Sequence, residues 1–278
     1  MRSPDSRTLA AGEGKTGVAR TDRRRRRSGR DAIPGIARPA AVLVAALLLW
    51  QAVVSLLAVP AFILPGPGRV AATLVAKAGF LVEHAAVTGF EIVAGLVVGT
   101  LAGVMTALVM SRFLLARQLV YPLVVVSQAL PVFAIAPLLV IWLGYGLASK
   151  VTMAAIIIYF PIASAFFDGL GRTDPGLLDL ARIAGASRLQ TLLAIRVPAA
   201  LPALGSGLKV AAAVAPIGAV VGEWVGASKG LGFVMLHANA RMQTDVVFAA
   251  LAVLAALALI FRFAVDRLAR LTERYEAG

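Results

Sequence analysis

Long apolar stretches, separated by short polar segments, recur along the chain after its first 38 residues. Each stretch is continuous and lacks the apolar–polar alternation of barrel strands, and a helix satisfies its own backbone hydrogen bonds within lipid. The pattern therefore predicts an all-α, polytopic membrane protein with about six transmembrane helices. The runs long enough to cross about 30 Å of hydrocarbon lie near residues 40–59, 86–110, 119–144, 150–168, 201–224 and 246–265.

The first 38 residues are basic and nearly free of large apolar side chains. Eleven of the chain's 27 Lys and Arg residues lie here, five of them in a row from Arg23 to Arg27. Such a segment buries too little apolar surface to fold, so residues 1–38 are predicted to form a disordered tail before a transmembrane domain at 39–270 and a second tail at 271–278. The first apolar run has about 20 residues, which is longer than the hydrophobic core of a signal peptide and favours a retained helix.

Composition and charge place the chain in a membrane and orient it. With 60% hydrophobic and 15% charged residues and a mean hydropathy of +0.87, the chain is too apolar for an ordinary soluble domain. If the N-terminus is cytoplasmic, 21 Lys and Arg residues fall on the cytoplasmic side and five on the outer side. The positive-inside rule therefore predicts cytoplasmic termini in an inner or plasma membrane, and the net charge of +13 calls for no nucleic-acid partner.

Glycine recurs at every fourth position in two of the expected spans, which places the glycines of each span on one helix face. Such a face lets two backbones approach closely, and packing within one subunit is the favoured interpretation. A subunit interface or a translocation path is the alternative. Prolines within the spans are predicted to kink or interrupt their helices. The glycines are Gly95, Gly99, Gly103, Gly218, Gly222 and Gly226, and the prolines are Pro131, Pro137, Pro161 and Pro216.

The segment between the fourth and fifth spans, residues 172–198, is long for a connector and carries helix signals. Asp174 before Pro175 is typical of an N-cap followed by proline at the first helical position, and Gly185 is typical of a helix end. A first short helix is therefore predicted between Asp174 and Gly185.

A second short helix is predicted directly after it. The sequence Ser-Arg-Leu-Gln at 187–190 is a capping box, and Pro198 and Pro202 are expected to bound the helix. Two capped helices of this kind are predicted to form a compact projection into the cytoplasm, suited to a groove on a partner protein.

This loop resembles the EAA loop of the membrane subunits of bacterial ATP-binding cassette (ABC) importers, whose pattern is Glu-Ala-Ala-x3-Gly-x9-Ile-x-Leu-Pro. Asp-Leu-Ala at 179–181 is followed by Gly185 and then by Ile-Arg-Val-Pro at 195–198. Asp, Leu and Val stand where the pattern has Glu, Ala and Leu. The resemblance implies a type I ABC importer permease fold, in which this loop is the coupling helix that docks on an ATPase. The coupling residues that it implies are Asp179, Ala181, Gly185, Ala186, Ser187, Ile195 and Pro198.

Further segments are similar to one branch of these permeases. Residues 63–67 and 127–146 resemble the nitrate, sulfonate and taurine branch, and residues 131–137, 216–226 and 238–245 are most similar to permeases for hydroxymethylpyrimidine, the pyrimidine precursor of thiamine. The resemblance implies import of that solute by ATP-driven alternating access. A sulfonate, taurine, nitrate or a similar small anion is the alternative solute.

The resemblance also implies the partners: an ABC ATPase subunit, an extracytoplasmic solute-binding protein, a second copy of the permease in a homodimer, and the lipid bilayer. The chain is then a transport subunit and not an enzyme, with no cofactor of its own and with ATP and Mg on the partner ATPase. It has no cysteine, and His84 and His237 are too isolated to predict a metal site. An ion-gradient-driven secondary transporter and a membrane enzyme are the alternatives, but neither a repeat nor a nucleophile with a base supports them.

Polar side chains in the expected spans are the candidates for a solute path, because burying charge in a membrane is costly. The alternative is a structural role, such as an ion pair of Glu91 with Lys209 or a Glu223 at the outer interface. Lys209 is the one cation expected inside the membrane, which favours a neutral solute over an anion. Aromatic rings in the spans are candidates to stack on a flat heteroaromatic solute, or else to pack or anchor the helices. The candidate path residues are Glu91, Gln128, Phe133, Lys209, Glu223 and Trp224.

Overall fold

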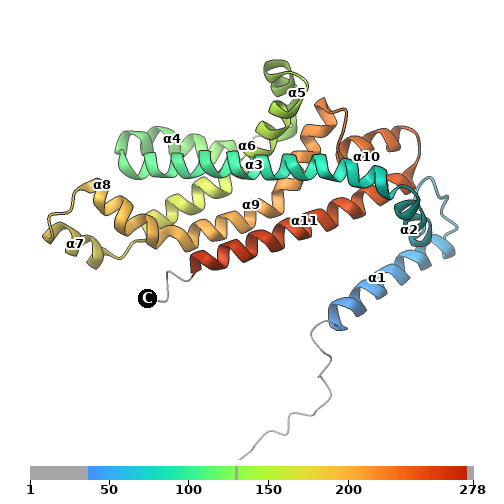
Figure 1. The fold of residues 1–278 in the computed structure, drawn as a ribbon, viewed down its shortest axis with the longest axis horizontal. Coiled ribbons are helices and arrows are strands. Elements are labelled where there is room, and N and C mark those ends of the chain that lie inside the picture. Colours follow the sequence, from blue (N-terminus) through green and yellow to red (C-terminus); the bar gives the residue numbers. More distant parts are fainter. Residues whose placement is uncertain (1–36, 129–130, 274–278) are drawn as a thin grey trace, which may run out of the picture. The chain divides into compact units, whose positions relative to one another are not determined.

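The structure, a computed structural model, describes residues 37–128 and 131–273. The described residues up to Ala46 and those from Leu47 onward belong to two separate units. All regular elements of the described residues are helical, as the hydropathy pattern predicts (Figure 1). Residues 1–36 of the predicted basic tail and residues 274–278 of the C-terminal tail lie outside the described residues.

The helices fall into three groups along the chain. Before the loop they are α1 (Ala37–Leu56), α2 (Pro67–Ala76), α3 (Ala78–Arg112), α4 (Leu114–Ser127), α5 (Val132–Leu143) and α6 (Leu147–Gly171). The loop holds α7 (Pro175–Ile183), α8 (Arg188–Thr191) and a π-helical turn, η1 (Leu192–Arg196). After it come α9 (Val197–Gly226), α10 (Leu231–Ala240) and α11 (Thr244–Glu273).

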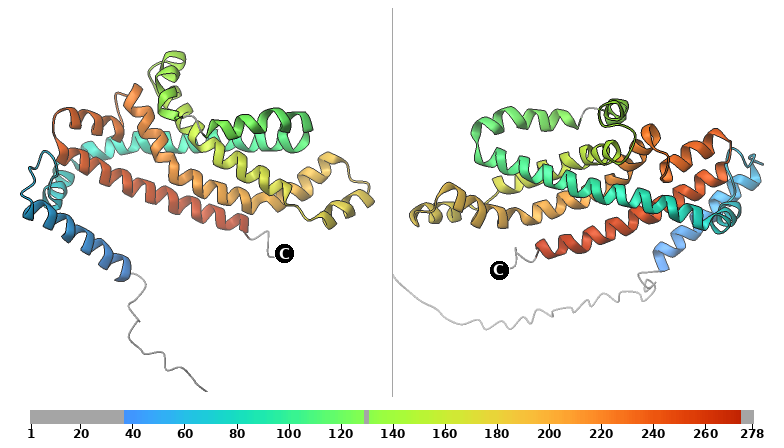
Figure 2. Two further views of the ribbon diagram at one scale, coloured as in Figure 1. Left: turned by 180° about the vertical axis from the view of Figure 1, so that it is seen from behind. Right: turned by 45° about the horizontal axis from the view of Figure 1, so that its top comes forward.

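Within the unit of residues 47–278, the long helices α3, α6, α9 and α11 run alongside one another (Figures 1 and 2). The short helices α7 and α8 lie at one end of these long helices, and α2 and α10 lie at the other end. We call these the α7 end and the α10 end.

Among the described residues, four helical segments are long and apolar enough to cross a membrane. They contain four of the predicted runs and extend beyond each of them, because polar residues at the ends continue the helices. The first predicted run forms α1, whose apolar part Ala40–Leu56 is a shorter helix. The four long segments are Ala78–Arg112, Leu147–Gly171, Arg188–Gly226 and Thr244–Arg270.

The predicted span at 119–144 is wrong as a single helix. It is divided between α4 and α5, which are bent by 106° relative to each other. Pro131 is the N-cap of α5, and proline has no N–H with which to continue a preceding helix. The described residues therefore contain four candidate spans, or five if the bent pair forms one broken span, against the predicted six.

The two glycine faces pack inside the subunit, mostly against α6. On α3, a Cβ added to Gly99 would lie 2.8 Å from Cγ2 of Ile158, and on α9 a Cβ added to Gly218 would lie 2.7 Å from Cα of Ala154. Such distances are too short for a real side chain, so glycine is what lets α3 and α9 approach α6. The interpretation of these faces as packing within one subunit is confirmed.

Most of the prolines in the spans do not interrupt their helices. Pro137, Pro161 and Pro216 lie inside α5, α6 and α9, each of which continues past its proline. Packed neighbouring helices tolerate such prolines in membrane proteins. Among the four, only Pro131 coincides with a helix boundary.

Candidate functional site

The first helix of the loop at the α7 end has both of its predicted ends. Oδ1 of Asp174 accepts a hydrogen bond of 2.7 Å from N of Gly176, and Pro175 occupies the first helical position of α7. At the other end, Gly185 has a φ of +72°, and N of Ala186 donates to O of Ala181 at 2.9 Å. Glycine is favoured at such a left-handed position because a side chain there would be strained. The predicted first helix is confirmed.

The capping box of the second helix is also confirmed, but this helix is not a separate element. Oγ of Ser187 accepts from N of Gln190, and Oε1 of Gln190 accepts from N of Ser187 at 2.8 Å. The helix then continues through η1 into α9, with Pro198 in the first turn of α9 and Pro202 inside it.

The prediction that the two prolines bound the second helix is therefore wrong. In η1, N of Val197 bonds to O of Leu192, five residues back. This wider π turn lies immediately before Pro198, whose missing N–H matters little in the first turn of a helix. As a result, the second helix of the loop is continuous with a long helix of the bundle.

The outer face of α7 is unusually apolar for an unpartnered surface helix. Leu177, Leu180 and Ile183 are 47%, 62% and 84% exposed. Next to them, Asp179 Oδ1 accepts a hydrogen bond of 2.8 Å from Arg182 Nη1, and both side chains are exposed. Exposed apolar patches of this kind mark surfaces that bind a partner.

The predicted coupling residues are spread over three environments. Ala181 is buried and fixes the inner face of α7. The others are at the surface or half-buried in the loop and its junction with α9. Exposed are Asp179, Gly185 and Ser187, and half-buried are Ala186, Ile195 and Pro198.

A buried ion pair joins α3 to α6 toward the α10 end. Nζ of Lys150 lies 2.7 Å from Oε1 of Glu91, and the side chains are only 8% and 1% exposed. Gly222 on α9 makes room for this pair, because a Cβ there would lie 3.1 Å from Cα of Lys150. Oε2 of Glu91 is buried without a hydrogen-bond partner. The predicted alternative of an ion pair for Glu91 holds, but its partner is Lys150 and not Lys209.

The carboxylate of Glu223 caps the N-terminus of α10. It is 1% exposed, and its Oε2 accepts hydrogen bonds from N of Gly232 and from N of Phe233. Its Oε1 accepts a hydrogen bond of 2.6 Å from Oγ1 of Thr88 on α3. A carboxylate at a helix N-terminus is stabilised by the free N–H groups and the helix dipole. Glu223 is thus a buried link between α9, α10 and α3.

The remaining N–H groups at the start of α10 bond to α3. N of Leu231 donates to Oγ1 of Thr88 at 2.8 Å, and N of Gly230 donates to Nδ1 of His84 at 2.9 Å. Outside this cluster, Nζ of Lys229 donates to Oε1 of Glu83 at 2.8 Å. That contact raises the pKa of Lys229. The polar contacts therefore hold the α9–α10 connection against α3.

The candidate path residues do not form one site. Glu91 and Glu223 lie together, and their carboxyl groups interact with each other. Gln128 follows α4 and is exposed, Phe133 on α5 is 69% exposed, and Trp224 on α9 is 51% exposed. Lys209 is half-buried on α9. Lys150 and Thr88 contact these two carboxyl groups, although the sequence analysis did not identify them as candidates.

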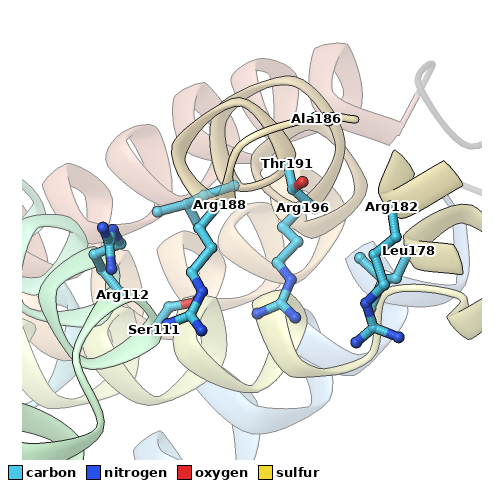
Figure 3. A pocket seen from close by; sticks show the side chains of 9 residues that line it. Ser111, Arg112, Leu178, Arg182, Ala186, Arg188, Thr191 and Arg196 are labelled. Carbon is cyan, nitrogen blue, oxygen red and sulfur yellow. The ribbon is translucent and has the colours of Figure 1, made fainter. Parts of the chain in front are cut away.

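A cavity of about 450 Å³ lies between the end of α3 and the loop (Figure 3). The guanidinium groups of Arg182, Arg188 and Arg196 extend from the loop in the same direction, and Arg112 lies beside them. A second cavity of about 550 Å³ adjoins it and shares three of these arginines. In the sequence analysis these arginines were counted only to predict the orientation of the chain in the membrane.

Known proteins are similar in sequence to this chain over most of its length. The family of binding-protein-dependent transport system inner membrane components matches residues 95–274. A probable ABC transporter permease protein of Haemophilus influenzae is 49% identical over 229 residues, which cover 82% of this chain and 94% of that protein. A riboflavin transport system permease protein of Chloroflexus aurantiacus is 35% identical, covering 88% and 92%. A formylaminopyrimidine transport permease protein of Halalkalibacterium halodurans is 32% identical, covering 80% and 89%.

The fold is also that of a solved transporter. The inward-facing MetNI methionine ABC transporter contains a chain that matches with a TM-score of 0.59 and 21% identity, covering 69% of this chain and 96% of that chain. The apolar helices and the projecting loop thus define a polytopic, all-α transport protein of the membrane. The chain belongs to the family of binding-protein-dependent transport system inner membrane components, the permease subunits of ABC importers.

Proposed function

We propose that this permease imports a flat nitrogen heterocycle, hydroxymethylpyrimidine or a related thiamine precursor. The observation that carries this choice of solute is the 32% identity to a protein named for formylaminopyrimidine transport. The relative named for riboflavin transport supports the same solute class, because riboflavin is also a flat nitrogen heterocycle. Phe133 and Trp224 are available to stack on such a ring, since both are more than half exposed.

In the proposed cycle the α7 end faces the cytoplasm and α7 docks on a separate ATPase subunit, which binds ATP and Mg. The exposed side chains of Leu177, Leu180 and Ile183 supply the apolar contact. Since α8 and η1 continue into α9, the helix passes a displacement of the docked loop on to the bundle. The close glycine contacts then pass it from α9 to α6. The result is alternating access to a path through the membrane, with no covalent change of the solute.

Uptake tests the proposed solute. In energised cells that contain the solute-binding protein and the ATPase, we expect uptake of labelled hydroxymethylpyrimidine to fall at least about tenfold when this chain is removed. The physical reason is that a membrane is a barrier to a polar heterocycle, so uptake depends on the permease. Labelled taurine and nitrate are measured in the same cells.

The control is the same strain with the chain restored. Chain-dependent uptake of taurine or nitrate, without uptake of the pyrimidine, would contradict the proposed solute and favour the anion alternative. Uptake that persists after removal of the ATPase would contradict an ATP-driven importer and favour a gradient-driven carrier.

We further propose that two copies of the chain associate through α5. This short helix carries several large apolar side chains on its surface: Phe133, Ile141 and Trp142 are 69%, 75% and 68% exposed, and Tyr145 after the helix is 84% exposed. Other residues of α5, among them Ala136 and Leu139, pack against α6 and α9, so these exposed side chains form an apolar surface that the described residues leave uncovered. A second copy would cover it and enclose a path between the subunits.

Single-cysteine crosslinking tests this association. The natural chain has no cysteine, so Ile141→Cys introduces a unique thiol at the exposed face of α5. We expect a short bismaleimide to convert most of this variant into a dimer in membranes. Leu259→Cys on α11 is the control, because Leu259 is 70% exposed on a different helix and should stay monomeric. Equal crosslinking of both variants, or of neither, would contradict association through α5.

A further inference from the structure

The two adjoining cavities at the α7 end form one groove, which we call the arginine groove. They lie where α3 ends, just after α6 ends, and beside α8 and η1. The second cavity has a volume of about 550 Å³. The arginines that line the groove apart from the α7 residue Arg182 are Arg112, Arg117, Arg172, Arg188 and Arg196.

The positive charge of this groove is not neutralised from within the described part of the chain. None of the five arginines forms an ion pair with a described acidic side chain, whereas Arg182 pairs with Asp179. Asp168 is the acidic residue that lines the groove. Two of the guanidinium groups instead lie over aromatic rings, Arg112 over Phe113 and Arg117 over Phe167. Five cations that line one groove call for an anionic ligand with several oxygens, for which the guanidinium fork is well suited.

The groove is also partly apolar, which indicates a ligand with a hydrocarbon portion. Met110, Leu114 and Phe167 line the second cavity together with the arginines. Leu114 and Leu115 are 70% and 66% exposed at the start of α4, and exposed leucines continue along that helix. The groove therefore lies at one end of helices that are long and apolar enough to cross the hydrocarbon of a membrane.

We propose that the arginine groove binds the phosphodiester headgroup of an anionic phospholipid. The phosphate lies among Arg112, Arg188 and Arg196, and the acyl chains follow the apolar side chains at the start of α4. Because Arg112 belongs to α3 while Arg188 and Arg196 belong to the loop, one bound phosphate joins the loop to the bundle. Basic pockets between membrane helices bind anionic headgroups in this way. The apolar lining favours a lipid over the other candidate, an acidic surface of the ATPase.

Lipid retention by the purified full-length permease tests the proposal. The protein is placed in phosphatidylcholine nanodiscs with increasing phosphatidylglycerol, and bound phosphatidylglycerol is counted by native mass spectrometry. The triple variant Arg112→Gln, Arg188→Gln and Arg196→Gln is expected to need at least about tenfold more phosphatidylglycerol for the same occupancy. The control triple variant Arg262→Gln, Arg267→Gln and Arg270→Gln removes equal charge near the end of α11 and should bind as the natural chain does.

Three results would overturn the proposal. Equal loss of lipid by both triple variants would mean general attraction of a basic surface. Binding of inorganic phosphate as tight as that of the lipid would remove the lipid assignment. Loss of ATPase binding by the groove variant in pure phosphatidylcholine would make the groove a protein-docking surface. If the glutamine variant fails to fold, a variant with lysine at the three groove positions tests the proposal instead, because it keeps the charge but lacks the guanidinium fork. It should bind lipid more weakly than the natural chain.

Discussion

Gly185→Val is expected to reduce ATP-dependent uptake at least about tenfold while the protein still inserts into the membrane. Gly185 ends α7 with a φ of +72°, and a Cβ there would meet no other atom. The substitution therefore acts through the backbone, because a left-handed conformation costs an ordinary residue about 1–2 kcal/mol and a β-branched one more. The turn between α7 and α8 then reorganises and moves the exposed apolar face of α7. Uptake is measured with both partner proteins present, and membrane content by immunoblot.

Two variants separate this effect from a general response to a larger side chain. Gly185→Asn is expected to keep most of the uptake, because asparagine tolerates the left-handed region. Gly79→Val places the same valine in the first turn of α3, where a Cβ also meets no atom and φ is not positive. It should transport as the natural chain does. Normal uptake by Gly185→Val would contradict a docking role for α7.

Lys150→Met is expected to lower the free energy of unfolding by about 3–5 kcal/mol, because it leaves the buried carboxylate of Glu91 without its cation. The side chain of Glu91 is 1% exposed, so water cannot replace the lost contact. The measurement is unfolding by sodium dodecyl sulfate in mixed micelles, followed by circular dichroism. A protein of ordinary stability would lose a large part of its margin through this one substitution.

The double variant Glu91→Gln with Lys150→Met is expected to recover much of that loss, because the charge of Glu91 is removed together with its cation. The two substitutions should therefore be strongly non-additive. Lys229→Met is the control at an exposed pair, since Lys229 and Glu83 are both 59% exposed, and its effect should be far smaller. Equal effects of Lys150→Met and Lys229→Met would contradict a buried pair.

The parts of the loop that the sequence predicted correctly depend on neighbours in the chain. Asp174 caps a group two residues away, Ser187 and Gln190 cap each other across three residues, and Gly185 is set by its own backbone angle. Each signal is complete within one turn of helix. The prediction that Pro198 and Pro202 bound the second helix was wrong because the helix continues through the π turn at 192–196. No residue type in that segment indicates such a turn.

The buried contacts of Glu91 and Glu223 could not be predicted from the sequence, because their partners come from distant segments of the chain. Lys150 is 59 positions from Glu91 along the chain. Thr88 and Glu223 are 135 positions apart. One local feature pointed to such a contact. The N-cap of α10 is Gly230, which has no side chain, so a group from elsewhere in the chain is needed to cap the helix. The break at Pro131 was missed for a different reason: hydropathy gives the length of an apolar run, but it does not show whether the helix changes direction within that run.

The continuity of α8, η1 and α9 makes the permease a lever. Arg188–Gly226 comprises 39 residues, which corresponds to a rod of about 58 Å at about 1.5 Å per residue. If the loop end is held and the rod tilts by about 5°, its far end moves by about 5 Å. Glu223 sits near that far end and holds the first turn of α10. In the proposed cycle, a small rotation of the docked loop is therefore magnified into a shift of about one helical pitch at the other end of this helix, without any helix having to unfold.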